Sequence, residues 1–150
     1  MKLDSMYQEI ILDHYRNPHG KGLRDGDAEV HHVNPTCGDE ITLRVRLDGS
    51  VVADISYESQ GCSISQASAS VLNDLVVGKT VGEGQAIQEA FLELMQSKGQ
   101  AEGDEEVLED AVAFAGVSKY PARVKCALLS WMAWKDATAK ALAEQPVIND

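Results

Sequence analysis

Residues 41–57, ITLRVRLDGSVVADISY, alternate apolar and polar side chains on both sides of a turn signal. A period of two is typical of a strand that buries one face. Asp48 and Gly49, at the centre, form a strong signal for a two-residue hairpin turn. The side chains expected on the buried face are Ile41, Leu43, Val45 and Leu47 before the turn and Val51, Ala53, Ile55 and Tyr57 after it. The stretch therefore predicts an antiparallel hairpin that must pack against other elements.

The segments around this hairpin add a strand before it and helices after it. Residues 28–33 are predicted to form the additional strand. Helices are predicted over residues 5–16, 63–77, 84–97, 105–115 and 121–142, from apolar spacing and from Gly and Pro near their ends. Strands followed by helices indicate the α+β class. We therefore expect residues 1–150 to form one domain, a three-stranded antiparallel sheet with helices packed on one face, and a frayed tail at about 145–150.

The overall charge argues against a nucleic-acid partner. The chain of 150 residues carries 13 Lys and Arg against 24 Asp and Glu, a net charge of −11, whereas phosphate binding requires clustered basic residues. No apolar run approaches the roughly 18 residues that a membrane span needs. The N-terminus becomes acidic and polar soon after its start, at Asp4 and Ser5, so no secretory signal is expected. These features predict a cytoplasmic protein with no nucleic acid and no membrane as a partner.

Three cysteines lie at junctions between the predicted elements. Cys37 falls between the first two strands, Cys62 falls between the third strand and the next helix, and Cys126 falls early in the last helix. In reducing compartments, grouped cysteines indicate metal binding or catalysis more often than disulfides. Their positions beside Gly and Pro favour a functional role on loops. Because a free cysteine is also a common buried apolar residue, three unrelated buried thiols remain an alternative.

Asp39 stands two residues after Cys37, with Gly38 between them. Three thiolates and one carboxylate make a four-coordinate ligand set that suits zinc. By spacing alone this is a weak signal, because the C-x-x-C pairs of zinc ribbons are missing from the sequence. The sequence also lacks the H-E-x-x-H motif of zincins and the Pro-Cys-x-x-Cys segment of deaminases, so both of those enzyme classes are excluded.

Four stretches of the chain together form a known family pattern. They are YQEIILDHYRNP at 7–18, NPTCGD at 34–39, GCSISQASAS at 61–70 and PARVKC at 121–126. In this order they resemble the iron–sulfur cluster assembly scaffold family of the IscU and NifU N-terminal type, over residues 1 to about 143. The resemblance implies the α+β fold predicted above. It also implies a metal site formed by Cys37, Asp39, Cys62 and Cys126.

Two departures distinguish branches of that family. Cluster scaffolds usually carry a His immediately before the third cysteine, whereas this chain has Lys125. The stretch between Gly78 and Tyr120 is also longer than in the scaffolds, and SufU-like proteins share that insertion. Both features make the chain most similar to the SufU branch, whose members are zinc-dependent sulfur-transfer proteins.

The resemblance implies a sulfur acceptor that works with a pyridoxal-phosphate cysteine desulfurase of the SufS type and with downstream SUF cluster-assembly proteins. Cys37 is expected to accept persulfide sulfur, because it lies in a Gly-flanked loop, and Arg123 is expected to steer the incoming sulfur anion. The alternative is a scaffold that carries a [2Fe–2S] cluster on the same four ligands. A zinc-stabilised interaction module without chemistry is a third possibility.

Overall fold

A computed structural model describes residues 5–36 and 38–144 of the protein. Its elements, in chain order, are α1 (Ser5–Arg16), β1 (Ala28–Asn34), β2 (Asp39–Asp48), β3 (Val51–Gln60), α2 (Ser63–Val76), α3 (Val81–Gln96), α4 (Glu105–Leu108), the 3₁₀ helix η1 (Glu109–Lys119) and α5 (Pro121–Glu144). Cys37 and the expected frayed tail at 145–150 lie outside the described residues. None of the described helices is long and apolar enough to span a membrane.

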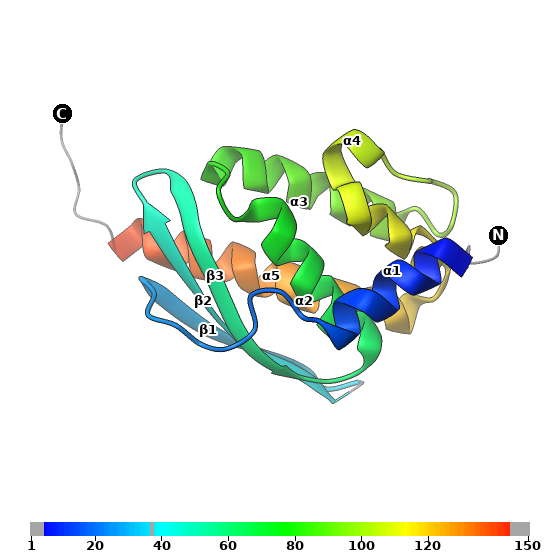
Figure 1. Ribbon diagram of the computed structural model, residues 1–150, viewed down its shortest axis with the longest axis horizontal. Coiled ribbons are helices and arrows are strands. Elements are labelled where there is room, and N and C mark those ends of the chain that lie inside the picture. The colour runs from blue at the N-terminus through cyan, green and yellow to red at the C-terminus, as the bar shows by residue number, and fades with distance from the viewer. Residues whose placement is uncertain (1–4, 37, 145–150) are drawn as a thin grey trace.

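The three strands form one antiparallel sheet in the order β1-β2-β3 (Figure 1). The alternation along β2 is the predicted one, and its buried apolar side chains are Ile41, Leu43, Val45 and Leu47. The long helix α5 packs along β1 and β2, and α2 packs against β3 and α5. The predicted α+β fold, a three-stranded antiparallel sheet with helices packed on one face, is confirmed.

The face assignment along β3 is wrong at its first residues. The register shifts between Arg46 and Leu47, so that Leu47 pairs with Val52 and one additional residue is inserted into β3. As a result Val52 is fully buried, whereas Val51 is 37% exposed. An inserted residue exchanges the two faces of a strand, because side chains alternate with a period of two. Strict alternation counted from the turn therefore predicted the wrong valine.

The predicted helix over residues 105–115 is also wrong. The α-helix ends at Leu108, and Glu109, the first residue of η1, adopts a positive φ of 45°. Eight consecutive residues of η1, from 111 to 118, are buried, so the segment has no solvent-exposed face. Apolar residues at helical spacing indicate a helix that is buried on one side only. In a segment that is buried on every side, this spacing does not identify the type of helix.

The helix α3 begins three residues earlier than its apolar spacing predicts. Thr80 caps it, because the Thr80 side chain accepts a hydrogen bond from the Glu83 N–H at 3.1 Å. The Glu83 carboxylate in turn accepts from the Thr80 N–H at 3.0 Å. This reciprocal capping box satisfies two N–H groups and sets the start of the helix.

Candidate metal centre

Asp39 is the first residue of β2 and pairs with Asn34, the last residue of β1. Its side chain is 1% exposed and turns toward the junction of β3 and α2. One carboxylate oxygen, Oδ1, accepts a hydrogen bond from the Cys62 N–H at 3.1 Å. The other, Oδ2, lies 3.9 Å from Cys62 Sγ. The carboxylate is therefore held beside a thiol by the backbone of the next junction.

Cys62 occupies the N-cap position of α2 with an extended backbone, φ −74° and ψ 170°. Its side chain makes no capping hydrogen bond, so Sγ remains available to the groups beside it, Asp39 and Ser65. Ser65 Oγ donates to the Cys62 carbonyl at 3.0 Å and lies 4.0 Å from Cys62 Sγ. The N-terminus of a helix carries positive partial charge. Cys62 therefore lies at the positive end of the α2 dipole.

Cys126 lies in the second turn of α5, which begins at Pro121. It is 1% exposed, and its Sγ lies 3.5 Å from the Ala122 carbonyl oxygen. One ligand atom from each of Asp39, Cys62 and Cys126 lies within 4.8 Å of the other two. Asp39 and Cys62 are 23 positions apart in the sequence, and Cys62 and Cys126 are 64 apart. They converge because the start of β2 and the starts of α2 and α5 meet at this end of the sheet.

Gly61 makes room for this arrangement. It has φ of 154°, and a Cβ added there would meet the Asp39 carboxylate and would lie 2.7 Å from Ser65 Oγ. Any larger residue would displace the carboxylate or the serine hydroxyl. The hollow around Asp39 is therefore built by the absence of a side chain at residue 61.

The residues of the centre fit a thiophilic cation. Among the described residues no Lys, Arg or His forms an ion pair with Asp39. A buried carboxylate without a positive partner is costly, and a metal ion compensates such a charge. Sulfur and oxygen donors at this separation suit Zn²⁺, which binds thiolates and carboxylates with similar bond lengths.

Two of the site residues predicted from the sequence are not in this group. Cys37 lies outside the described residues. The chain forms a tight turn between Asn34 and Gly38, because the Gly38 N–H donates to the Asn34 carbonyl at 2.9 Å. Asn34 in turn pairs with Asp39 across the strands. Arg123 is exposed in the first turn of α5. In the described part of the chain its side chain makes no hydrogen bond or ion pair, so it is available to an incoming group.

A groove of about 420 Å³ lies next to the centre, between the end of β1 and one face of α5. Its lining is mainly apolar and includes Val33, which is 52% exposed, and Met132, which is 40% exposed. The same groove is lined by Lys125, the neighbour of Cys126. An exposed apolar surface beside a reactive site is typical of a protein contact.

Two contributors to the centre were missed by the sequence analysis. Ser65 follows the N-cap residue by three positions, which is the spacing at which a side chain returns to the cap. Gly61 precedes a cysteine at a strand-to-helix junction, where a glycine indicates a close approach of another group. Both signals are present in the sequence, but neither identifies Asp39 as the group approached.

The fold and this site define a class, an α+β domain that gathers thiols and a buried carboxylate where strand and helix starts meet. The model of the NifU-like N-terminal domain family matches residues 6–127. The chain belongs to this family.

Several relatives match nearly the whole chain. The zinc-dependent sulfurtransferase SufU of Bacillus subtilis is 45% identical over 92% of this chain and 92% of its own length. The iron–sulfur cluster assembly scaffold protein IscU of Streptococcus pyogenes is 40% identical, over 96% of this chain and 89% of its own.

Solved structures share the fold. A putative iron–sulfur cluster assembly scaffold protein for the SUF system from Fervidobacterium islandicum has a TM-score of 0.79 and 34% identity, covering 89% of this chain and 96% of its own. A NifU-like N-terminal protein from Brucella abortus has a TM-score of 0.83 and 29% identity, covering 95% and 98%.

Proposed function

We propose that this chain is a zinc-dependent sulfur acceptor that takes persulfide sulfur from a cysteine desulfurase for iron–sulfur cluster assembly. The observation that carries the proposal is the convergence of Cys62 and Cys126 on a buried Asp39 carboxylate with no described basic partner. The similarity to the Bacillus subtilis sulfurtransferase over 92% of the chain supports the same function.

The ligand set of this proposal is Cys37, Asp39, Cys62 and Cys126. When bound, Zn²⁺ would keep the three cysteines as thiolates near neutral pH, and the thiolate is the nucleophilic form of cysteine. With three thiolates and one carboxylate the site has a net negative formal charge, which favours the release of one thiolate. Burial of Asp39 and Cys126 keeps water away from the remaining ligands.

Cys37 is the proposed acceptor. Cys126 is 1% exposed on a helix, and Cys62 is partly buried at the start of another, so neither is placed to reach a partner's persulfide. Thr36 and Gly38, on either side of Cys37 in the chain, are both exposed. The Cys37 thiolate attacks the outer sulfur of the desulfurase persulfide, the S–S bond breaks, and its electron pair leaves on the desulfurase cysteine. The sulfur then remains as a persulfide on Cys37.

Arg123 is proposed to guide this transfer. It lies one helical turn before Cys126, is exposed, and has no described side-chain partner. A guanidinium at that place attracts the anionic persulfide and offsets the negative charge of the site. The proposed role is positioning and electrostatic guidance, because proton transfer from an arginine is not needed in this reaction.

The proposed partner is a pyridoxal-phosphate cysteine desulfurase of the SufS type, with SUF cluster-assembly proteins downstream in the cytoplasm. The groove beside the centre offers this partner an apolar surface with Val33 and Met132 at its rim and Lys125 next to Cys126. Docking there would bring the persulfide of the desulfurase close to the chain segment that contains Cys37.

The direct test is a desulfurase assay with cysteine and the zinc-loaded protein. Stimulated alanine release, together with a gain of one sulfur atom on the peptide that contains Cys37, is the expected result. If the desulfurase is unaffected and no sulfur is gained, the proposal is wrong. A sulfur gained on the Cys126 peptide would contradict the choice of acceptor alone.

The groove makes a separate prediction. Met132→Glu should raise the desulfurase concentration needed for half-maximal stimulation by about tenfold or more, because the change buries a charge in an apolar contact. Leu142→Glu is the matched control, since Leu142 is also 40% exposed on α5 but does not line the groove. Equal effects of the two changes, measured at equal zinc content, would exclude docking at the groove.

A second candidate function is a scaffold that holds a [2Fe–2S] cluster on the same ligands. The Streptococcus pyogenes relative named as a cluster assembly scaffold, 40% identical, favours it. Metal analysis after purification distinguishes the two. A colourless zinc protein supports sulfur transfer, whereas visible sulfide-to-iron absorbance that survives purification supports the scaffold.

A further inference from the structure

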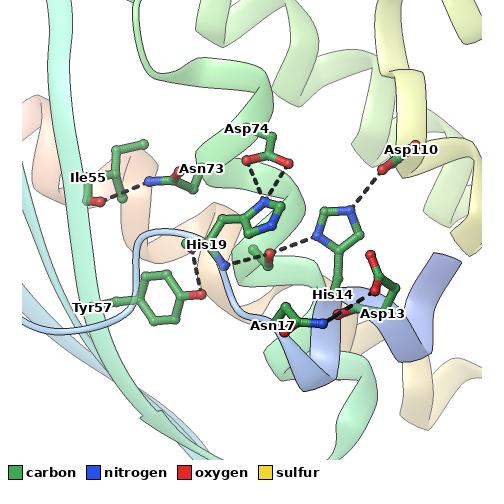
Figure 2. A network of polar contacts seen from close by, with 10 residues as sticks. Asp13, His14, Asn17, His19, Ile55, Tyr57, Asn73, Asp74 and Asp110 are labelled. Carbon is green, nitrogen blue, oxygen red and sulfur yellow. Dashed lines mark hydrogen bonds and ion pairs between the residues drawn. The ribbon is translucent and has the colours of Figure 1, made fainter.

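A second group of metal-ligating side chains lies away from the thiols, where α1, the loop after it and α2 meet. His14 is on α1, His19 is in the loop, and Asp74 is on α2 (Figure 2). One ligand atom from each lies within 4.8 Å of the other two. The two imidazole rings are in edge contact, with centroids 5.1 Å apart. No cysteine takes part, so this group is chemically different from the centre described above.

The contacts of His14 indicate which of its ring nitrogens carries the proton. Its side chain is 4% exposed, and Nε2 lies 2.8 Å from Asp110 Oδ2. A carboxylate can only accept, so Nε2 carries the hydrogen. Nδ1 lies 2.7 Å from Ser70 Oγ, which also accepts from the His19 N–H at 2.9 Å. The serine hydroxyl hydrogen is then directed to Nδ1, which keeps its lone pair.

His19 faces a carboxylate inside the group. Its Nδ1 lies 2.8 Å from both carboxylate oxygens of Asp74, so a nitrogen ligand and an oxygen ligand face each other. Nε2 has no hydrogen-bond partner among the described residues, so it can carry the ring hydrogen when Nδ1 binds an ion. The side chains of His19 and Asp74 are 47% and 43% exposed, so an ion from solvent can reach them.

His14 therefore has one nitrogen held by a carboxylate outside the group, that of Asp110, and the other nitrogen directed into the group. Histidines that bind metals share this pattern, because the outer carboxylate fixes the tautomer and makes the ligating nitrogen more basic. The two neutral rings with the carboxylates of Asp74 and Asp110 give the group a formal charge that one divalent cation neutralises. Metal–nitrogen and metal–oxygen bonds of about 2.0–2.2 Å keep ligand atoms within roughly 4.4 Å of one another, close to the separation already present.

We propose that His14, His19 and Asp74 form a second metal site, which binds one divalent ion of the borderline class that imidazole prefers, such as Zn²⁺, Ni²⁺ or Co²⁺. His14 and His19 each supply one nitrogen, Asp74 supplies an oxygen, and Asp110 orients His14 from the opposite side. Binding at His14 Nδ1 takes the place of the hydrogen bond from Ser70. The ion would connect α1, the loop after it and α2, while Asp110 links His14 of α1 to η1.

The test is a cobalt titration of the tag-free protein whose thiolate centre is already loaded with zinc. The wild-type chain should bind one additional Co²⁺ with visible d–d absorbance and without the near-ultraviolet sulfur-to-cobalt band. His19→Ala and Asp74→Asn should each lose that ion or weaken its binding at least tenfold. Both replaced side chains are partly exposed, and the backbone groups of His19 that bond to Ser70 and Tyr57 are retained.

His31→Ala is the matched control, because His31 is an exposed histidine on β1 whose ring hydrogen-bonds to Thr42 and to no other described residue. It should bind the additional Co²⁺ as the wild type does. The proposal is overturned if all four proteins bind the same amount, if His31→Ala loses the ion equally, or if the additional ion shows the sulfur band. Nitrogen chemical shifts of the imidazoles give an independent readout, since His14 and His19 should shift while His31 does not.

Discussion

At the scale of single residues, the surroundings of Asp39 determine what the centre can hold. The carboxylate accepts a hydrogen bond from the Cys62 N–H and is 1% exposed, without a described basic partner. A hydrogen bond to an N–H stabilises an anion, yet one such bond does not replace the hydration that burial removes. The position of Asp39 therefore depends on the space left by Gly61, and the proposed bound cation would compensate its charge.

Gly61→Ala tests that space. The added methyl group would meet the Asp39 carboxylate and Ser65 Oγ, so we expect a loss of about 1–3 kcal/mol in unfolding free energy and a lower zinc content. Gly82→Ala serves as the control, because a Cβ at residue 82 meets nothing closer than 4.0 Å in the exposed first turn of α3. Urea unfolding and elemental analysis of both variants measure the difference, and an unchanged zinc content in Gly61→Ala would contradict this account.

The proposed division of roles among the cysteines makes a second prediction. Cys37→Ser should abolish sulfur acceptance and leave some zinc bound, because three ligands remain and water can complete the site. Cys126→Ser should lose zinc and sulfur acceptance together, since Cys126 is buried within a helix and no mobile group can replace it. Metal content and peptide mass after incubation with desulfurase and cysteine provide the measurement. Equal zinc loss in both variants would show that the roles are not divided in this way.

At the scale of elements, Tyr57 ties the loop after α1 to the sheet. Its hydroxyl donates to the His19 carbonyl at 2.9 Å, and its carbonyl accepts from the Gly22 N–H at 2.8 Å. Because His19 lies in that loop, the same contacts hold one ligand of the proposed second metal site in place. Burial raises the pKa of Tyr57 well above its ordinary value of 10.0, and the nearby charges of Asp74 and Glu58 add to the shift.

This raised pKa predicts a loss of stability in alkali. Below pH 10 the hydroxyl is protonated in both the folded and the unfolded chain, so it adds no pH dependence. Above that pH the unfolded chain ionises first, and stability falls as pH rises toward the folded pKa. Tyr57→Phe should lower the free energy of unfolding by about 0.5–1.5 kcal/mol at neutral pH, because a hydrogen bond is lost. The stability of the variant should then decrease less steeply than that of the wild type between about pH 9 and pH 11. Urea unfolding across this range, with identical slopes for both proteins, would refute the assignment.

At the scale of the whole molecule, the core extends far beyond the metal centre. Its largest fully buried side chains are distributed over the sheet and the helices, and they include Trp131, Trp134, Tyr57, Phe91 and Phe114. A chain of 150 residues buries enough apolar surface to fold on its own. The centre lies at one end of the sheet, so a bound ion adds stability to a structure that already exists.

Chelation should therefore lower the melting temperature without destroying the transition. A site formed only in the native state adds its binding free energy to folding, and we expect a decrease of several degrees with one cooperative step retained. Calorimetry with and without a chelator measures it, and Cys126→Ser provides the control because its melting should not respond to chelator. An apo protein without a folded baseline would mean that the metal is required for folding.

The sequence alone determined the elements whose burial is one-sided. Residues 41–47 alternate strictly because one face of β2 meets the helices and the other does not. Asp48 and Gly49 identified the hairpin, and the cysteines at element junctions identified the end of the sheet where Asp39, Cys62 and Cys126 meet. These signals are local, and local burial is what a periodic pattern records.

Only the tertiary structure decided features that join distant parts of the chain. The inserted residue in β3 exchanged Val51 for Val52 in the core, because register depends on the partner strand rather than on the strand itself. The hollow at Gly61 exists because Asp39 approaches it from another strand. His14 and Asp74 are 60 positions apart in the numbering and meet because α1 packs on α2. Contacts of this kind arise from long-range packing, which has no period along the chain.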